Sequence, residues 1–232
     1  MARDVGQDVE QVTWAVRAQA VTHQIISGDK RLTILDGVGL DIAQGESVAI
    51  VGRSGSGKTT LLSMLAGLDR PTNGRIELAG SDLGELDEDA RARLRAGRVG
   101  FVFQSFQLLA GFTALENAKL GADLAGHADA SRRAEQALEQ VGLTSRAGHH
   151  PYQLSGGEQQ RVAIARAFAA SPSILFADEP TGNLDSATGA DIIDLLFELN
   201  RNRGATLVLV THDPDLAKRC GRTLTLVQGR LG

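Results

Sequence analysis

Short apolar runs separated by turn-forming residues dominate the beginning of the chain. Apolar and β-branched residues are concentrated at 14–23 and 32–42, and the segment SGDK at 27–30 lies between them. Such runs on both sides of a Gly-containing turn predict two antiparallel strands around a loop. Further apolar runs predict strands at 47–51, 75–79, 99–103, 173–177, 206–210 and 223–227.

Segments with helical spacing alternate with these strands. They predict helices at 59–67, 88–96, 113–125, 130–141, 157–169 and 187–200. Strands that alternate with helices favour a parallel α/β sheet. The arginines of the polar helix at 88–96 are expected to form a solvated face.

The middle of the chain has a different pattern, because no strand-like run occurs between 104 and 172. We therefore expect one domain over residues 1–232. Its strand-rich core would comprise about 1–103 and 156–232, and a helical subdomain at about 104–155 would be inserted into it.

The amino-acid composition excludes several classes of function. The net charge of −4 argues against a general nucleic-acid-binding surface. The single cysteine, Cys220, excludes a disulfide framework and a Cys-rich zinc site, and it favours a reducing cytoplasm. Residues 1–10 are acidic and do not predict a signal peptide. No apolar run approaches the ~18 residues of a membrane span, so at a membrane another chain would have to anchor this one.

The segment GRSGSGKT at 52–59 matches the phosphate-loop pattern G-x-x-x-x-G-K-[ST] in full and follows an apolar run. Its glycines let successive backbone N–H groups point into one anion-binding concavity, and the next helix directs its positive end there. Lys58 supplies a charge for the β- and γ-phosphates, and the Thr59 hydroxyl is a ligand for Mg²⁺. The predicted ATP-binding residues are Gly52, Arg53, Ser54, Gly55, Ser56, Gly57, Lys58, Thr59 and Thr60.

A second phosphate cradle is predicted at 154–160, in the segment LSGGEQQ. Ser155 occupies the N-cap position of a helix, and two glycines expose the first backbone N–H groups to an anion. One triphosphate needs only one cradle, so two cradles predict that each completes a site on another copy of the chain. The residues are Leu154, Ser155, Gly156, Gly157, Glu158 and Gln159.

Further candidates lie at the ends of apolar strands. Asp178 and Glu179 end the run ILFADE, and alternation along a strand should point them apart. We assign Asp178 to the metal and Glu179 to the general base that faces the attacking water. Gln104 follows VGFVF and can ligate metal or water, although a lone Gln there is usually only a polar terminus. His212 follows TLVLVT at a carboxyl strand end, where doubly wound sheets bind ligands, although a lone His there is more often structural.

These motifs, in this order, resemble the ATP-binding-cassette (ABC) ATPases over nearly the whole chain. The resemblance implies an α/β fold with a RecA-like P-loop NTPase core, an antiparallel β-subdomain and an inserted α-helical subdomain. It implies a head-to-tail dimer with two ATP and Mg²⁺ at the interface, the metal held by Thr59, Gln104 and Asp178. The matching motifs are the Q-loop at Gln104, the signature at 154–159, the Walker B strand at 174–178, the catalytic Glu179, the D-loop Asn183, Leu184 and Asp185, and the H-loop His212.

The sequences of segments 85–109 and 176–200 are similar to those of the LolD/MacB-type group, whose bacterial members work with FtsX-like permeases. This similarity implies the ATP-hydrolysing subunit of a bacterial transporter or of a force-transmission complex. Such a subunit drives a separate integral-membrane permease from the cytoplasmic face of the inner membrane. One position departs from the family. Ile25 occupies the slot of the usual adenine-stacking aromatic, and Trp14 lies too far upstream. Losing a base–aromatic stack forfeits ~1–3 kcal/mol, which weakens the expected preference for ATP over GTP.

Two other classes remain as alternatives. An ABC ATPase of DNA repair or chromosome maintenance would carry coiled coils or zinc modules between Lys58 and Ser155, and that interval has neither heptads nor cysteine. A nucleotide-gated binding module without turnover is disfavoured by Glu179 and His212. The sequence does not identify a transported substrate or a particular permease.

Overall fold

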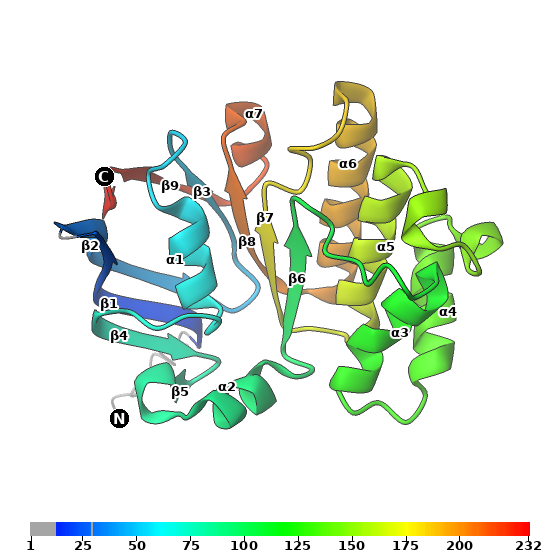
Figure 1. The fold of residues 1–232 in the computed structure, drawn as a ribbon, viewed down its shortest axis with the longest axis horizontal. Helices are drawn as coiled ribbons and strands as arrows, with labels where there is room; N and C mark the ends of the chain where they lie inside the picture. Colours follow the sequence, from blue (N-terminus) through cyan, green and yellow to red (C-terminus); the bar gives the residue numbers. More distant parts are fainter. Residues whose placement is uncertain (1–12, 29) are drawn as a thin grey trace, which may run out of the picture.

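A six-stranded sheet forms the centre of the molecule in the computed structural model, which describes residues 13–28 and 30–232. Its strand order is β10-β9-β3-β8-β7-β6, and all neighbours are parallel except β10 and β9. The parallel α/β sheet predicted from the sequence is therefore confirmed (Figure 1). The strands are β3 (Ser47–Val51), β6 (Val99–Phe103), β7 (Ile174–Asp178), β8 (Thr206–Thr211), β9 (Arg222–Val227) and β10 (Arg230–Leu231).

A second, antiparallel sheet has the order β2-β1-β4-β5. The predicted hairpin is confirmed, and its strands extend further than the sequence pattern indicated. The strands are β1 (Trp14–Ser27), β2 (Lys30–Ala43), β4 (Asn73–Leu78) and β5 (Ser81–Asp82). Helix α1 (Lys58–Leu65) lies between this sheet and the six-stranded sheet (Figure 1).

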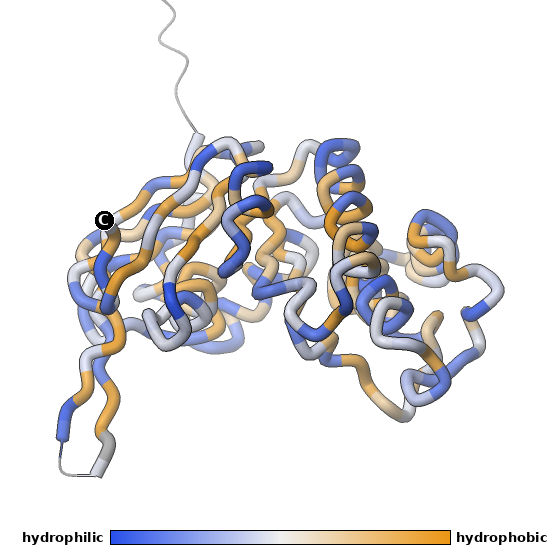
Figure 2. Tube along the Cα trace, turned by 90° about the horizontal axis from the view of Figure 1, so that it is seen from above, coloured by the Kyte–Doolittle hydropathy of each residue, from blue (hydrophilic) through white to orange (hydrophobic). Residues whose placement is uncertain are grey.

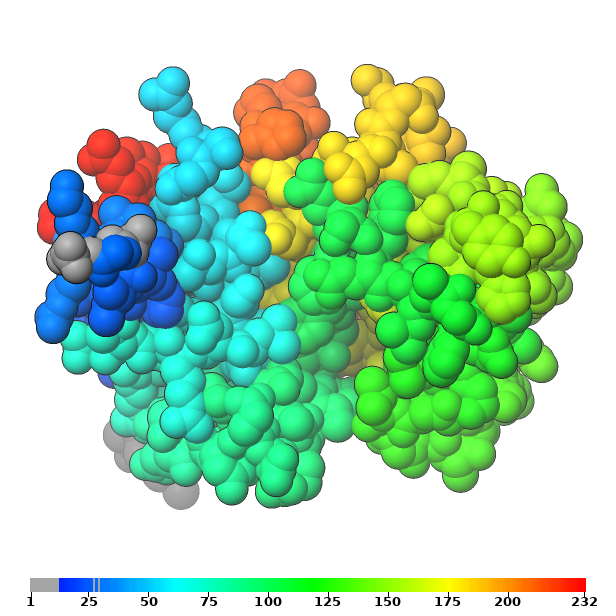
Figure 3. Space-filling model, in the orientation of Figure 1, coloured from blue at the N-terminus to red at the C-terminus, as the bar shows by residue number. Residues whose placement is uncertain are grey.

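The remaining long helices gather at the other end of the molecule. They are α3 (Ala114–Leu124), α4 (Ala130–Gln140), α5 (Gly156–Ala169) and α6 (Ser186–Arg203). In the space-filling view the green and yellow-green surface of this helical end stands opposite the blue and cyan surface of the β1–β4 region (Figure 3). The short helices α2 (Glu88–Arg95) and α7 (Pro214–Ala217) lie at the edges.

The six-stranded sheet separates two hydrophobic cores. On β7, Ile174 and Phe176 pack into the core that contains α1, whereas Leu175 and Ala177 pack into the core of α3 to α6. Side chains alternate along a strand, so successive residues serve opposite faces. The hydropathy view shows apolar positions of α6 beside polar ones along the same helix (Figure 2). Helices α1 and α5 consequently lie on opposite faces of one sheet.

The structure corrects one expectation about α2. Its arginines do not form a uniformly solvated face, because Arg91 is buried and pairs with Glu88, while Arg93 is exposed. Arg91 and Leu94 are three residues apart and therefore share the helix face that packs inward. The two-residue strands and α7 were not predicted, since such short elements carry no periodic pattern.

None of the helices in 13–28 and 30–232 is both long and apolar enough to cross a bilayer. The prediction for residues 1–10 lies outside the described residues.

Candidate active site

The phosphate loop joins β3 to α1, as predicted. Lys58 is buried, and its Nζ donates to the carbonyl oxygens of Gly52 at 2.9 Å and Arg53 at 3.2 Å, so the side chain spans its own loop. Gly57 has φ 99°, and a Cβ there would lie 3.0 Å from the Ile34 carbonyl oxygen. Glycine is required because this left-handed backbone and this close approach both disfavour a side chain.

Parallel pairing brings the predicted acidic residues to the same edge of the sheet as the loop. The Thr59 hydroxyl donates to Oδ1 of Asp178 at 3.3 Å, although the two residues are far apart in the chain. Burial raises the pKa of Asp178, and the negative charge of Glu179 raises it further, whereas the Thr59 hydrogen bond and Lys58 oppose the rise. A nearby cation would stabilise the charged carboxylate.

The Glu179 carboxylate has a different partner from that of Asp178. Its backbone has φ 44°, and its Oε2 lies 2.8 Å from Nδ1 of His212. The expected divergence of the two carboxylates agrees with these separate partners. This contact links Glu179, the last residue of ILFADE, to His212, the residue that follows β8.

Gln104 follows β6 and is linked to the D-loop segment. Its Nε2 donates to Oδ1 of Asn183 at 3.3 Å, and Nδ2 of Asn183 donates to the Gln104 carbonyl at 2.9 Å. The sequence placed both residues in motifs but gave no signal for this pairing. A Cβ on Gly182 would lie 2.7 Å from Nε2 of Gln104, so the glycine makes room for it.

A cavity of about 700 Å³ lies beside the phosphate loop. Its volume is within the range of small-ligand sites. Lys58, Gln104, Glu179 and His212 all line it. Its apolar lining residue is Ile34 of β2, which the sequence did not single out; Ile25 is not among the lining residues. The others are Ser54, Gly55, Gly57, Thr59 and Thr60.

The donors beside this cavity fit Mg²⁺. A threonine hydroxyl and a carboxylate are in contact at Thr59 and Asp178, and Gln104 supplies an amide oxygen nearby. Mg²⁺ is usually held by one or two carboxylates together with substrate phosphates. Within 13–28 and 30–232 there is no cluster of three or more His, Cys, Asp or Glu that could hold a metal.

The second phosphate cradle, at 154–160, lies at the beginning of α5, where Ser155 is the N-cap residue. The Ser155 hydroxyl accepts from the Glu158 N–H at 3.3 Å, and Oε2 of Glu158 accepts from the Ser155 N–H at 2.8 Å, which is a complete capping box. These backbone and side-chain bonds to Ser155, with Arg146 alongside, lower the pKa of Glu158. The predicted N-cap at Ser155 is confirmed.

The signature glycines also have a packing role that the sequence did not reveal. A Cβ on Gly157 would lie 2.5 Å from Cγ2 of Thr188, and one on Gly156 would lie 3.3 Å from Cδ2 of Leu184. The D-loop and the start of α6 therefore lie directly against the signature. Asp185 is the N-cap of α6 and accepts from the Thr188 N–H at 3.0 Å, which lowers its pKa.

The two cradles do not meet within one chain. The phosphate loop opens α1 on one face of the six-stranded sheet, and the signature opens α5 on the other (Figure 1). Of the described residues, none from 154–159 lines the cavity beside Lys58.

The class of protein follows from this fold and from the comparison with known families. The chain belongs to the ABC transporter family, whose sequence model matches residues 35–182. It is an ATP-binding subunit of that family and an ATPase. The predicted α/β ABC ATPase fold is confirmed.

Two relatives show which members of the ABC transporter family the chain resembles. It is 58% identical to the ABC transporter ATP-binding protein YbbA of Escherichia coli K12 over 218 residues, which cover 93% of this chain and 96% of YbbA. It is 48% identical to the lipoprotein-releasing system ATP-binding protein LolD of Xanthomonas euvesicatoria, over 97% of this chain and 93% of LolD. The chain thus resembles YbbA and the LolD group.

A solved structure agrees with this placement. The ATP-binding cassette MJ0796, determined as a dimer in a post-hydrolysis state with ADP and Pi, has a TM-score of 0.87 and 41% sequence identity. The match covers 93% of this chain and 96% of MJ0796.

Proposed function

We propose that two copies of this chain close head to tail around two ATP molecules, so that each phosphate loop faces the partner's residues 154–159. The observation that carries this proposal is the position of the two cradles on opposite faces of one sheet. One chain cannot direct both at one triphosphate, whereas a second copy can supply the missing half. The dimer of MJ0796 supports this arrangement.

Within each site, the chain's own residues have distinct roles. The loop amides and Lys58 bind the β- and γ-phosphates, and Glu179 accepts a proton from the attacking water. His212 holds the Glu179 carboxylate through the 2.8 Å contact. Thr59, Gln104 and Asp178 would hold Mg²⁺, which neutralises charge that develops on the phosphates.

The dimer is proposed to drive a separate integral-membrane permease of the FtsX type, at the cytoplasmic face of the inner membrane. The similarity to LolD, an ATP-binding protein of a lipoprotein-releasing system, supports a membrane complex. The amino-acid sequence of segment 85–109, which is similar to that of the LolD/MacB-type group, supports a permease of the FtsX type. The helical part at about 104–155 is proposed to be an insert in a single 232-residue domain. Helix α5 links this insert to the core, because it packs against α3 and α4 as well as against β6 and α6.

Mixing two inactive variants tests the shared site. Lys58→Ala damages the phosphate-loop half, and Ser155→Arg damages the signature half. Their heterodimer contains one site in which an intact loop meets an intact signature, so ATPase activity should partly return on mixing. Mixing Lys58→Ala with Glu179→Gln is the matched control, because both changes lie in the phosphate-loop half and leave neither site intact. Full activity of the wild type as a monomer at high dilution would refute the shared site.

A further inference from the structure

The loop after β6 has an unfavourable backbone that requires outside support. Phe106 has φ 58° and Gln107 has φ 49°, so two consecutive non-glycine residues are left-handed. Residues with side chains adopt this conformation at a cost, and a folded protein retains it only where surrounding contacts determine it. The same loop begins at Gln104, which lines the ATP cavity.

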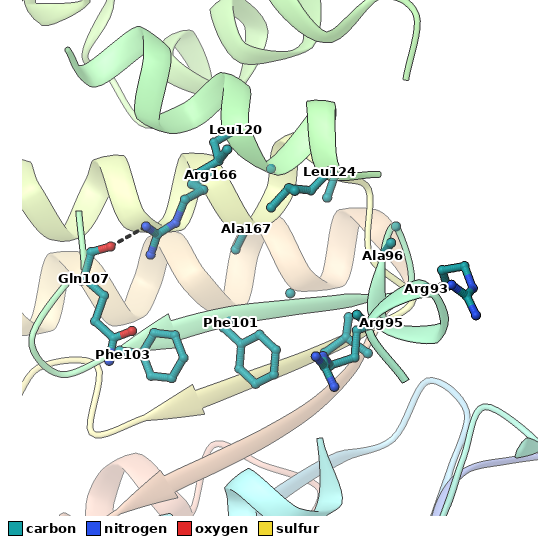
Figure 4. A pocket seen from close by; sticks show the side chains of 16 residues that line it. Arg93, Arg95, Ala96, Phe101, Phe103, Gln107, Leu120, Leu124, Arg166 and Ala167 are labelled. Carbon is teal, nitrogen blue, oxygen red and sulfur yellow. Dashed lines mark hydrogen bonds between the residues drawn. The ribbon is translucent and has the colours of Figure 1, made fainter. Parts of the chain in front are cut away.

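Arg166 supplies that support from the signature helix. Its guanidinium donates to the Phe106 carbonyl at 2.9 Å. It also donates to the Gln107 carbonyl at 2.5 Å, which is the bond drawn in Figure 4. The two bonds use the forked geometry of the guanidinium, which a lysine ammonium cannot reproduce. Across 13–28 and 30–232 the structure shows no ion pair for Arg166, and burial lowers its pKa. A charged group is thus held in a largely apolar cavity of about 540 Å³ with these two carbonyls as its polar contacts.

The supported loop contacts both halves of the proposed catalytic arrangement. At its beginning, Gln104 is held by the two hydrogen bonds with Asn183. At Phe106, the ring tip lies 3.7 Å from the position of a Cβ on Gly156, so the ring rests against the signature. Arg166 lies on the helix that Gly156 begins, and therefore joins the loop to the same rigid element.

The packing of α5 on α3 does not depend on the guanidinium. A Cβ on Gly121 would lie 2.0 Å from the carbonyl oxygen of Arg166, so the close helix–helix approach is made by backbone atoms. The guanidinium reaches toward Gln107 of the loop (Figure 4). Loss of the guanidinium should therefore affect the loop more than the helix packing.

We propose that Arg166 is a positioning residue for ATP hydrolysis, which fixes Gln104 and Phe106 by holding the carbonyls of the left-handed pair 106–107. The proposal rests on the proposed function, in which Gln104 and the signature serve the same reaction. ATP contacts of the phosphate loop are separate from this clamp. Arg166 should accordingly control turnover and leave nucleotide binding nearly unchanged.

Arg166→Met tests the clamp, since it removes the guanidinium and keeps an unbranched apolar side chain. We expect kcat to fall by about tenfold to a hundredfold, as for other small misplacements of a site, while KM for ATP changes less than about twofold. Arg161→Met is the matched control. Arg161 lies on the same helix and donates to the Val141 carbonyl at 3.3 Å, away from the loop. Its kcat should stay near wild type, and both variants should unfold at similar temperatures.

A rescue distinguishes positioning from general packing. Asparagine adopts the left-handed conformation more readily than glutamine, so Gln107→Asn should restore part of the kcat lost in Arg166→Met. Equal kcat in the Arg166→Met and Arg161→Met proteins would overturn the proposal, as would a loss without any rescue. If Arg166→Met does not fold, Arg166→Lys carries the test: a reduced kcat that Gln107→Asn raises supports the clamp, and wild-type kcat refutes it. An inactive or monomeric wild type would contradict the proposed function instead.

Discussion

Oε2 of Glu179 lies 2.8 Å from Nδ1 of His212, and this contact joins the ends of two neighbouring parallel strands. The Glu179 N–H donates to the Val210 carbonyl at 2.9 Å, and the backbone φ of Glu179 is 44°. The Glu179 side chain is 15% exposed and that of His212 is 71% exposed, so the imidazole lies on the open side of the pair. The geometry gives the carboxylate a fixed direction toward the ATP cavity.

Glu179→Gln should bind ATP and hydrolyse it ~10²–10⁴-fold more slowly, because the amide cannot accept the proton of the attacking water. Unhydrolysed ATP should also trap the dimer, which size-exclusion chromatography with ATP and Mg²⁺ would detect. Glu198→Gln is the control, since Glu198 is exposed on α6. Wild-type turnover in Glu179→Gln, or a protein that never dimerises with ATP, would contradict these roles.

Lys58→Ala should abolish tight ATP binding. Lys58 is the buried cation of the loop, and a charged hydrogen bond of this kind contributes roughly 1.5–3 kcal/mol. Calorimetric titration with ATP measures the effect. Lys119→Ala removes a surface lysine that pairs with Asp123, and should leave ATP affinity unchanged. Retention of micromolar affinity by Lys58→Ala would show that the loop assignment is wrong.

The buried thiol of Cys220 should make the free energy of unfolding fall as the pH rises above about 9. Burial raises the pKa of this thiol from 9.0 to about 11. Between these values the unfolded chain has lost the thiol proton while the folded chain keeps it, so the free energy of unfolding falls as pH rises. A shift of this size corresponds to about 3 kcal/mol once both states are ionised.

Urea unfolding of the wild type and of Cys220→Ala, from pH 8 to pH 11, isolates this contribution from other titrating groups. The wild type should lose more stability than the variant above pH 9. Parallel stability curves for the two proteins would show that the folded thiol titrates normally.

Local patterns predicted much of the fold and of the site, because they depend on neighbours in sequence. The phosphate loop and the N-cap at Ser155 are determined by a few consecutive residues, and both are predicted from the sequence. The reciprocal bond from Glu158 that completes the capping box is seen only in the structure. The pairing of Gln104 with Asn183 was not, since it joins residues 79 positions apart and depends on how β6 and β7 align. The clamp from Arg166 to Gln107 is equally non-local, because an arginine on a helix gives no sign of which carbonyl it will reach.

The position of the nucleobase stays a prediction. The predicted slot was Ile25 on β1, which is 40% exposed and pairs with Leu32. The end of this hairpin projects from the rest of the molecule and carries hydrophobic positions on both arms (Figure 2). The cavity beside the phosphate loop is lined instead by Ile34, farther along the hairpin. An aliphatic side chain near the loop supplies apolar contact to a base without π-stacking.

Weak discrimination between nucleobases is the last prediction. Recognition should rest on the triphosphate and Mg²⁺, which all nucleoside triphosphates share, because a missing stack of ~1–3 kcal/mol removes much of the means of base discrimination. We therefore expect GTP to support hydrolysis within about tenfold of ATP, measured as kcat/KM. Ile25→Tyr should tighten ATP binding if the ring reaches the base. Ile26→Tyr is the matched control, because this neighbour is 81% exposed and alternation along the strand directs it to the other face. Strong ATP selectivity in the wild type, unchanged by Ile25→Tyr, would indicate that His23 or a side chain of the partner copy covers the base.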